Sequence, residues 1–144
     1  VLRVKMRHLP QAVEARQANA KRYEQMFRDA GLLDRGSVEL PVHDPNAFHV
    51  WNQYTLRVTG GRRDALKASL AENGIGTEIY YPVPMHRQDC FAHIATPKGG
   101  LKETERACAE VLNLPIYPEL RIDEQSRVVD SIKQFYRSQV RAAA

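Results

Sequence analysis

Apolar residues recur at helical spacing over the first thirty positions of the chain. Four of them, from Leu2 to Val13, follow one another at i, i+4, i+7 and i+11, which places them on one face of a helix. The periodicity continues to Gly31, a residue type that favours the end of a helix. Pro10 lacks a backbone donor and crowds the turn before it, so we expect a kink or break near Leu9.

Alternating apolar and polar residues predict two strands after this helix. Residues 38–42 form a short alternating run, and a clearer one covers residues 49–58. In the second run the alternation assigns Trp51 and Gln53 to one face and the more apolar even-numbered positions to the other. Asn52 then falls on the apolar face, where an amide without hydrogen-bond partners would cost about 1–3 kcal/mol.

The rest of the chain alternates between helical and extended patterns. Helices are predicted over residues 63–73, 102–113 and 123–140, and a short one over residues 86–94. A strand over residues 77–81 would complete a β-α-β unit, whose crossover is right-handed if its two strands are parallel neighbours. Together these elements predict an α+β fold, a small sheet with helices packed on it, in a single domain.

The composition is that of an ordinary globular domain. The 144 residues are 43% hydrophobic and 26% charged, and a chain of this length buries a core without disulfides. Two cysteines, Cys90 and Cys108, are too few for a disulfide framework, which favours a cytoplasmic protein. The net charge of +4 is spread along the chain, and no apolar run approaches a membrane span. We therefore expect neither a nucleic acid nor a membrane as partner.

The first residues indicate a helix that begins before the sequence does. No capping residue precedes the helical pattern, and Arg3, Lys5 and Arg7 lie at the end of the helix dipole that disfavours cations. We therefore expect the helix to begin in sequence upstream of Val1.

Two groups of residues are candidates for chemistry. His86, Cys90 and His93 would share one face of the short predicted helix, but the paired-cysteine spacing of zinc sites is missing, so we expect no metal site. The segment from Tyr80 to Gln88 follows a predicted strand end, is stiffened by two prolines, and combines phenols with an imidazole, a guanidinium and an amide. That density favours an anionic or polyhydroxylated ligand, and a purely structural role for the segment stays equally open.

Four stretches closely resemble, in order and spacing, the C-terminal part of the DegT/DnrJ/StrS aminotransferases. They read VLRVKMRHL at residues 1–9, VWNQYTLRV at 50–58, GIGTEIYYPVPMHRQ at 74–88 and VLNLPIYPEL at 111–120. The first resembles the helix that joins the large and small domains of that family. The resemblance therefore implies an interdomain helix region at residues 1–31 and the α/β body of a single small domain at residues 38–144. The resemblance implies the small domain of a fold-type-I transferase, with the large domain that binds pyridoxal 5'-phosphate (PLP) absent from this chain.

The resemblance also implies a reaction and its partners. Members of the family are PLP-dependent enzymes, normally homodimers, that transfer an amino group from glutamate or glutamine to a keto carbon of a nucleotide-linked sugar. Their Schiff-base lysine precedes the part that this chain resembles, so neither a catalytic residue nor bound PLP is expected here. By position, the resemblance implies substrate contacts from His86 and Tyr81 first, then from Asn52, Tyr80 and Arg87.

A hypothesis from a different class is a stand-alone α+β regulatory module that binds an anionic ligand or RNA. It would use the basic first helix and the tyrosine-rich segment. A native start near Val1, or nucleic-acid binding that weakens steeply with salt, would favour it.

Overall fold

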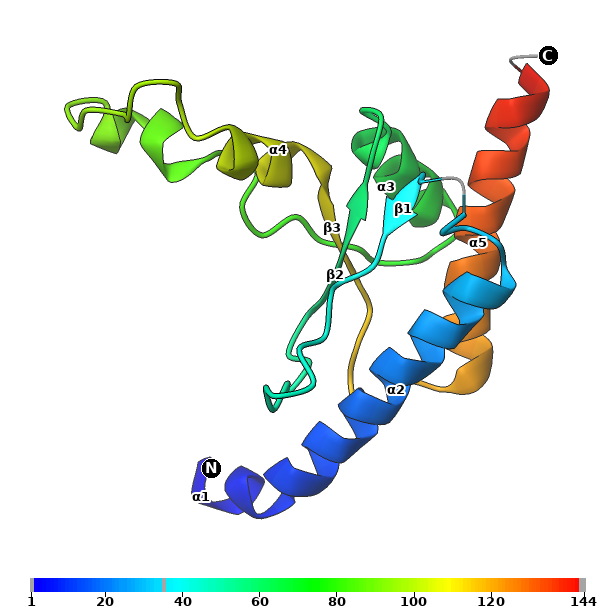
Figure 1. The fold of residues 1–144 in the computed structure, drawn as a ribbon. Coiled ribbons are helices and arrows are strands. Elements are labelled where there is room, and N and C mark those ends of the chain that lie inside the picture. Colours follow the sequence, from blue (N-terminus) through cyan, green and yellow to red (C-terminus); the bar gives the residue numbers. More distant parts are fainter. Residues whose placement is uncertain (1, 35, 143–144) are drawn as a thin grey trace.

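The computed structural model describes residues 2–34 and 36–142 of a fold in which a small sheet separates two groups of helices (Figure 1). Its helices are α1 (Leu2–Lys5), α2 (Leu9–Asp29), α3 (Arg63–Glu72), α4 (Lys102–Glu110) and α5 (Ile122–Ala142). Its strands are β1 (Val38–Glu39), β2 (Tyr54–Val58) and β3 (Val111–Leu114), and its 3-10 helices are η1 (Met6–His8), η2 (Met85–Arg87) and η3 (Asp89–Phe91). Within these ranges no helix is long and apolar enough to cross a membrane. The α+β prediction is confirmed.

The sheet is antiparallel, in the order β1-β2-β3, and Leu56 in the middle of β2 faces Leu112 of β3. The predicted strand over residues 77–81 is reduced to one bridge, which joins Glu78 to Asn113 of β3. Because this bridge and the β2–β3 pairing are both antiparallel, the Glu78 segment runs parallel to β2 with β3 between them. The two parallel segments are therefore not neighbours, contrary to the simplest β-α-β arrangement.

One face of the sheet carries the core, and α2, α3 and α5 cover it. Every second residue of β2 points into this core, as the alternation predicts for a strand with one covered face. Burial of each large apolar side chain contributes about 1.5–3 kcal/mol, so this face provides most of the folding free energy. Its largest fully buried aromatic and aliphatic side chains are those of Tyr23, Phe27, Tyr54, Leu56, Leu66, Leu70, Leu112 and Ile132.

A buried polar cluster joins α2 to α5. The Gln125 side chain is fully buried, and its Nε2 donates to the backbone oxygen of Asn19 at 2.9 Å. Its Oε1 accepts from Arg22 Nη1 at 2.6 Å, and the same nitrogen donates to Asn19 Oδ1 at 2.8 Å. The amide is therefore satisfied at both ends, which a buried polar group requires.

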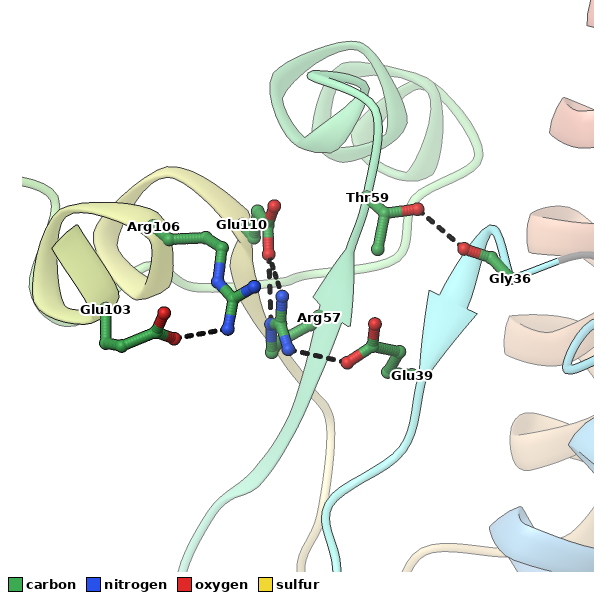
Figure 2. A network of polar contacts seen from close by, with 7 residues as sticks. All are labelled: Gly36, Glu39, Arg57, Thr59, Glu103, Arg106 and Glu110. Atoms are coloured by element: carbon green, nitrogen blue, oxygen red, sulfur yellow. Dashed lines mark hydrogen bonds and ion pairs between the residues drawn. The ribbon is translucent and has the colours of Figure 1, made fainter.

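The opposite face of the sheet is polar (Figure 2). Arg57 of β2 lies between Glu39 of β1 and Glu110 at the end of α4, with Arg57 Nη1 2.6 Å from Glu39 Oε2 and an ion pair to Glu110. These two carboxylates raise the pKa of Arg57, with the Glu110 hydrogen bond as the main cause. The network links the sheet to α4 without apolar packing.

Several predicted boundaries are wrong for identifiable reasons. The helix predicted over residues 102–113 ends at Glu110, because residues 111–114 pair with β2 as a strand instead. The run over residues 38–42 forms a strand only at Val38 and Glu39, since Pro41 has no N–H to pair and Val42 is 94% exposed. Tertiary pairing and proline chemistry overrule the local patterns in both cases.

The helices predicted over residues 1–31, 63–73 and 123–140 are confirmed for the described residues. The first helix breaks at η1, immediately before Pro10, as predicted from the proline. The helix over residues 63–73 and the last helix form with their predicted apolar faces buried. The short helix predicted over residues 86–94 does not form: Gln88 is extended and separates η2 from η3. The spacing argument that placed three possible metal ligands on one helix face therefore fails.

Candidate functional site

The backbone changes direction at Trp51, and this sets the position of Asn52. Trp51 has a φ of 48°, a left-handed conformation that is unfavourable for a bulky residue. Its N–H donates to His49 Nδ1 at 3.0 Å, and Arg16 and Gln17 of α2 donate to the carbonyls of residues 50 and 49 at 2.9 Å. Hydrogen bonds to α2 therefore hold this turn in place.

The alternation predicted over residues 49–58 is broken by this turn. Trp51 is buried against Tyr54 rather than on the polar face, and β2 begins only at Tyr54. Asn52 is exposed, so its predicted place on the apolar face is wrong and it needs no buried partner. Both Asn52 and Gln53 instead border a hollow at the end of the sheet.

The first hollow, of about 300 Å³, lies between the start of β2, the Glu78 bridge and the end of β3. Asn113 forms part of its wall: the Asn113 Nδ2 donates to the Glu78 carbonyl at 3.0 Å, and its Oδ1 accepts from Thr55 Oγ1. The residues that line the hollow are Asn52, Gln53, Gly76, Thr77, Glu78, Tyr80, Asn113, Leu114, Pro115 and Ile116.

The second hollow, of about 450 Å³, adjoins the first and shares Tyr80 with it. It is formed by the tyrosine loop, defined here as residues 79–84, and by the residues that follow it. Tyr80 and Tyr81 are 50% and 72% exposed, so both phenols are available to a ligand. The residues that line this hollow are Tyr80, Tyr81, Pro82, Val83, Arg87, Gln88 and Asp89.

His86 lines neither of these hollows. Its Nε2 lies 2.9 Å from Glu105 Oε1, and its side chain is only 14% exposed. It borders instead an apolar hollow of about 380 Å³ in the arm, defined here as residues 85–110. Figure 1 shows that the arm projects from the sheet, on the side away from α2 and α5.

Two carboxylates near the hollows are held in their charged form. The Ile79 N–H and the Lys67 ammonium, which lie 2.9 and 3.6 Å from Glu78 Oε1, lower the pKa of Glu78. Hydrogen bonds from His86 and then Arg87 lower the pKa of Glu105. Amides, one phenol and a charged carboxylate around the first hollow suit a ligand with many hydroxyl groups.

The structure brings four of the five predicted residues to the two adjoining hollows. Asn52 and Tyr80 border the first, and Tyr80, Tyr81 and Arg87 border the second, whereas His86 is directed into the arm. The sequence analysis missed four further residues of this region. Their positions depend on the turn at Trp51, on the bridge between Glu78 and β3, and on the packing of α4 beside η2. They are Gln53, Glu78, Glu105 and Asn113.

A comparison with known protein families gives a match over residues 1–133, to the DegT/DnrJ/EryC1/StrS aminotransferase family. The chain belongs to the DegT/DnrJ/EryC1/StrS aminotransferase family. Among curated members, a protein of Geobacillus stearothermophilus named a pleiotropic regulatory protein is 41% identical over 138 residues, which are 95% of this chain and 36% of that protein. A dTDP-3-amino-3,4,6-trideoxy-alpha-D-glucose transaminase of Streptomyces venezuelae is 36% identical over 135 residues, 94% of this chain and 34% of the enzyme.

Solved structures of the family have the same fold. S. venezuelae DesV, in complex with a ketimine intermediate, matches 94% of this chain with a TM-score of 0.83 and 36% identity. A family aminotransferase from Brucella abortus matches 94% of the chain with a TM-score of 0.81 and 32% identity. In both cases the match covers 34% of the solved chain, and the chain spans about a third of the length of the curated relatives.

Proposed function

We propose that this chain is the C-terminal small domain of a PLP-dependent aminotransferase that acts on a nucleotide-linked keto sugar, with glutamate or glutamine as amino donor. Family membership supports the transamination, and the names of relatives that are dTDP- and UDP-sugar transaminases support the substrate class. The observation that carries the proposal is the gathering of Asn52, Tyr80, Tyr81 and Arg87 around two adjoining hollows.

The hydrogen-bonding groups at these hollows support a sugar-nucleotide as ligand. Phenols of Tyr80 and Tyr81 and the amide of Asn52 both donate and accept, as sugar hydroxyls require. The Arg87 guanidinium suits a phosphate or carboxylate, although Glu105 already compensates part of its charge. In this proposal His86 acts through Glu105, because its Nε2 lies against that carboxylate and its side chain lines neither hollow.

The two hollows do not themselves fit PLP. PLP supplies an electron sink for amino transfer when it is bound through a lysine, and no lysine lines either hollow within residues 2–34 and 36–142. We therefore propose that the cofactor and the Schiff-base lysine belong to the rest of the enzyme. The residues of this chain would then bind and orient the sugar side of the reaction.

The N-terminal helical region supports packing against the rest of the enzyme. Leu2, Met6 and Leu9, three of the four residues of the predicted apolar face, are exposed, whereas the fourth, Val13, is buried. Exposed apolar side chains that share one helix face are typical of an interface. We propose that α1 and η1 pack on the large domain or on the second subunit of a homodimer.

The test is transamination by the full-length enzyme, followed as 2-oxoglutarate release from glutamate with dTDP- and UDP-linked keto sugars. Tyr81→Phe and Asn52→Ala should each raise KM for the sugar about tenfold, the loss of one hydrogen bond to a ligand. Tyr117→Phe is the matched control, because it also removes an exposed phenol but lies outside both hollows. Activity without PLP, or equal effects of all three substitutions, would refute the proposal.

A further inference from the structure

The tyrosine loop is attached at both of its ends to one continuous element, α4 with β3. At the near end Glu78 and Asn113 of β3 exchange backbone hydrogen bonds of 2.8 and 3.2 Å. At the far end His86 and Arg87, in η2, both reach Glu105 of α4. Because α4 continues directly into β3, the two attachment points belong to the same element.

Glu105 makes the far attachment with a single carboxylate oxygen. Its Oε1 lies 2.9 Å from His86 Nε2 and from Arg87 Nη2, and 3.2 Å from Arg87 Nε. Adjacent residues of a chain ordinarily point in different directions, and here the 3-10 turn of η2 brings both side chains to one acceptor. Hydrogen bonds between charged groups are stronger than neutral ones, so this contact is well suited to fix the start of the arm.

Between the two attachment points only Ile79 of the loop packs against the core, and the residues after it are held by few contacts. Tyr80, Tyr81 and Val83 are exposed, and the Gln88 Nε2 to Val83 carbonyl contact is long, at 3.5 Å. In the described part of the chain neither tyrosine hydroxyl has a hydrogen-bond partner within the protein. The direction of both phenols therefore depends on where the ends of the loop are fixed.

We propose that Glu105 is a positioning residue of the substrate site: it holds His86 and Arg87 and thereby fixes the tyrosine loop over the two hollows. This inference rests on the proposed function for the identity of the ligand, but the fixing of the loop concerns contacts within this chain alone. Glu105 itself borders neither hollow, so it acts through the loop and does not contact the substrate.

Amide hydrogen exchange on the 144-residue chain tests whether Glu105 holds the tyrosine loop in place. In peptides covering residues 79–88, Glu105→Ala should make the Arg87 and Gln88 amides, which donate to the carbonyls of residues 84 and 85, exchange about tenfold faster. That factor is expected for the loss of a charge-assisted hydrogen bond at a partly exposed site. Glu105→Gln keeps an acceptor oxygen and should give an intermediate rate. Peptides from α2 and α5 should exchange as in the parent chain, which shows that the fold is intact.

Glu103→Ala is the matched control. Glu103 also lies in the first turn of α4 and also pairs with an arginine, but its partner Arg106 is on α4 itself. If Glu103→Ala accelerates exchange in residues 79–88 as much as Glu105→Ala does, or if neither accelerates it, the inference is wrong.

The consequence for the substrate is measured in the full-length enzyme. Glu105→Ala should raise KM for the keto sugar about tenfold and change kcat less than about threefold, because the loop orients the ligand and does not react with it. An unchanged KM beside accelerated exchange overturns the role at the substrate site. A parent enzyme without aminotransferase activity refutes the proposed function instead, and the exchange experiment still decides whether Glu105 holds the loop.

Discussion

The covered face of the sheet and the arm are stabilised in different ways. On the covered face, apolar side chains from α2, α3 and α5 meet those of β2 and β3, and many of them are fully buried. The arm has two 3-10 helices, one helix of nine residues, and several apolar side chains that stay exposed. It is held mainly by ion pairs and hydrogen bonds at Glu105, Glu110 and Arg63.

This difference shows how the domain separates stability from function. The free energy gained by packing grows with the buried apolar area, and close packing of these side chains holds the sheet against the helices. Tyr80, Tyr81 and Arg87 lie where that packing ends, on a segment held by polar contacts, and Asn52 lies at a turn before β2. Such segments open more readily than the core, which suits a site that must admit and release a ligand.

The largest expected effect is on stability, and it is seen when one apolar residue in each region is replaced by alanine. Leu56→Ala should lower the free energy of unfolding by about 3 kcal/mol, because Leu56 is fully buried in the central strand and its truncation leaves a cavity. Ile94→Ala removes a comparable side chain from the arm, where it is 56% exposed, and should cost less than about 0.5 kcal/mol. Urea unfolding followed by circular dichroism measures both, and equal losses would contradict the division into two regions.

A smaller effect is expected from the polar cluster within the core region. Gln125→Ala should cost about 2 kcal/mol, because the Arg22 guanidinium and the Asn19 carbonyl lose a partner in a buried setting. Gln134→Ala is the control, since Gln134 lies on the exposed side of the same helix. Urea unfolding measures both variants. An unchanged free energy of unfolding in Gln125→Ala would mean that α2 and α5 are joined by apolar packing alone.

The smallest expected effect concerns the arm and depends on pH. The pKa of Glu105 is lowered in the folded chain, chiefly by His86 and then by Arg87, so its contacts are fully present above the ordinary glutamate pKa. They are lost as the pH falls through the lowered value. An NMR titration of the Glu105 carboxyl carbon should therefore give a midpoint below that of an exposed glutamate, and His86→Ala should shift it upward. A midpoint that His86→Ala leaves unchanged would show that the two side chains do not interact in solution.

Much of the fold was predictable because it depends on local chemistry. The period of apolar residues located α2, α3 and α5, and Pro10 located the break at η1. The helix predicted over residues 63–73 is α3, and Gly74 directly after it has the positive φ of 70° that suits glycine. The conspicuous Tyr80–Gln88 segment was recognisable from its residue types, and four of the five predicted ligand residues do border the two hollows.

The sequence by itself determined the apolar faces of α2, α3 and α5, the break in the first helix near Pro10, and which segment is rich in ligand-binding groups. Only the tertiary structure decided that residues 111–114 are a strand, since their pairing with β2 outweighs the helical pattern that precedes them. It also decided that Trp51 turns inward and Asn52 outward, and that Glu105 meets His86. These contacts join residues that are far apart in the chain. The periodicity of apolar residues reports only local structure, so it cannot show which distant residues meet.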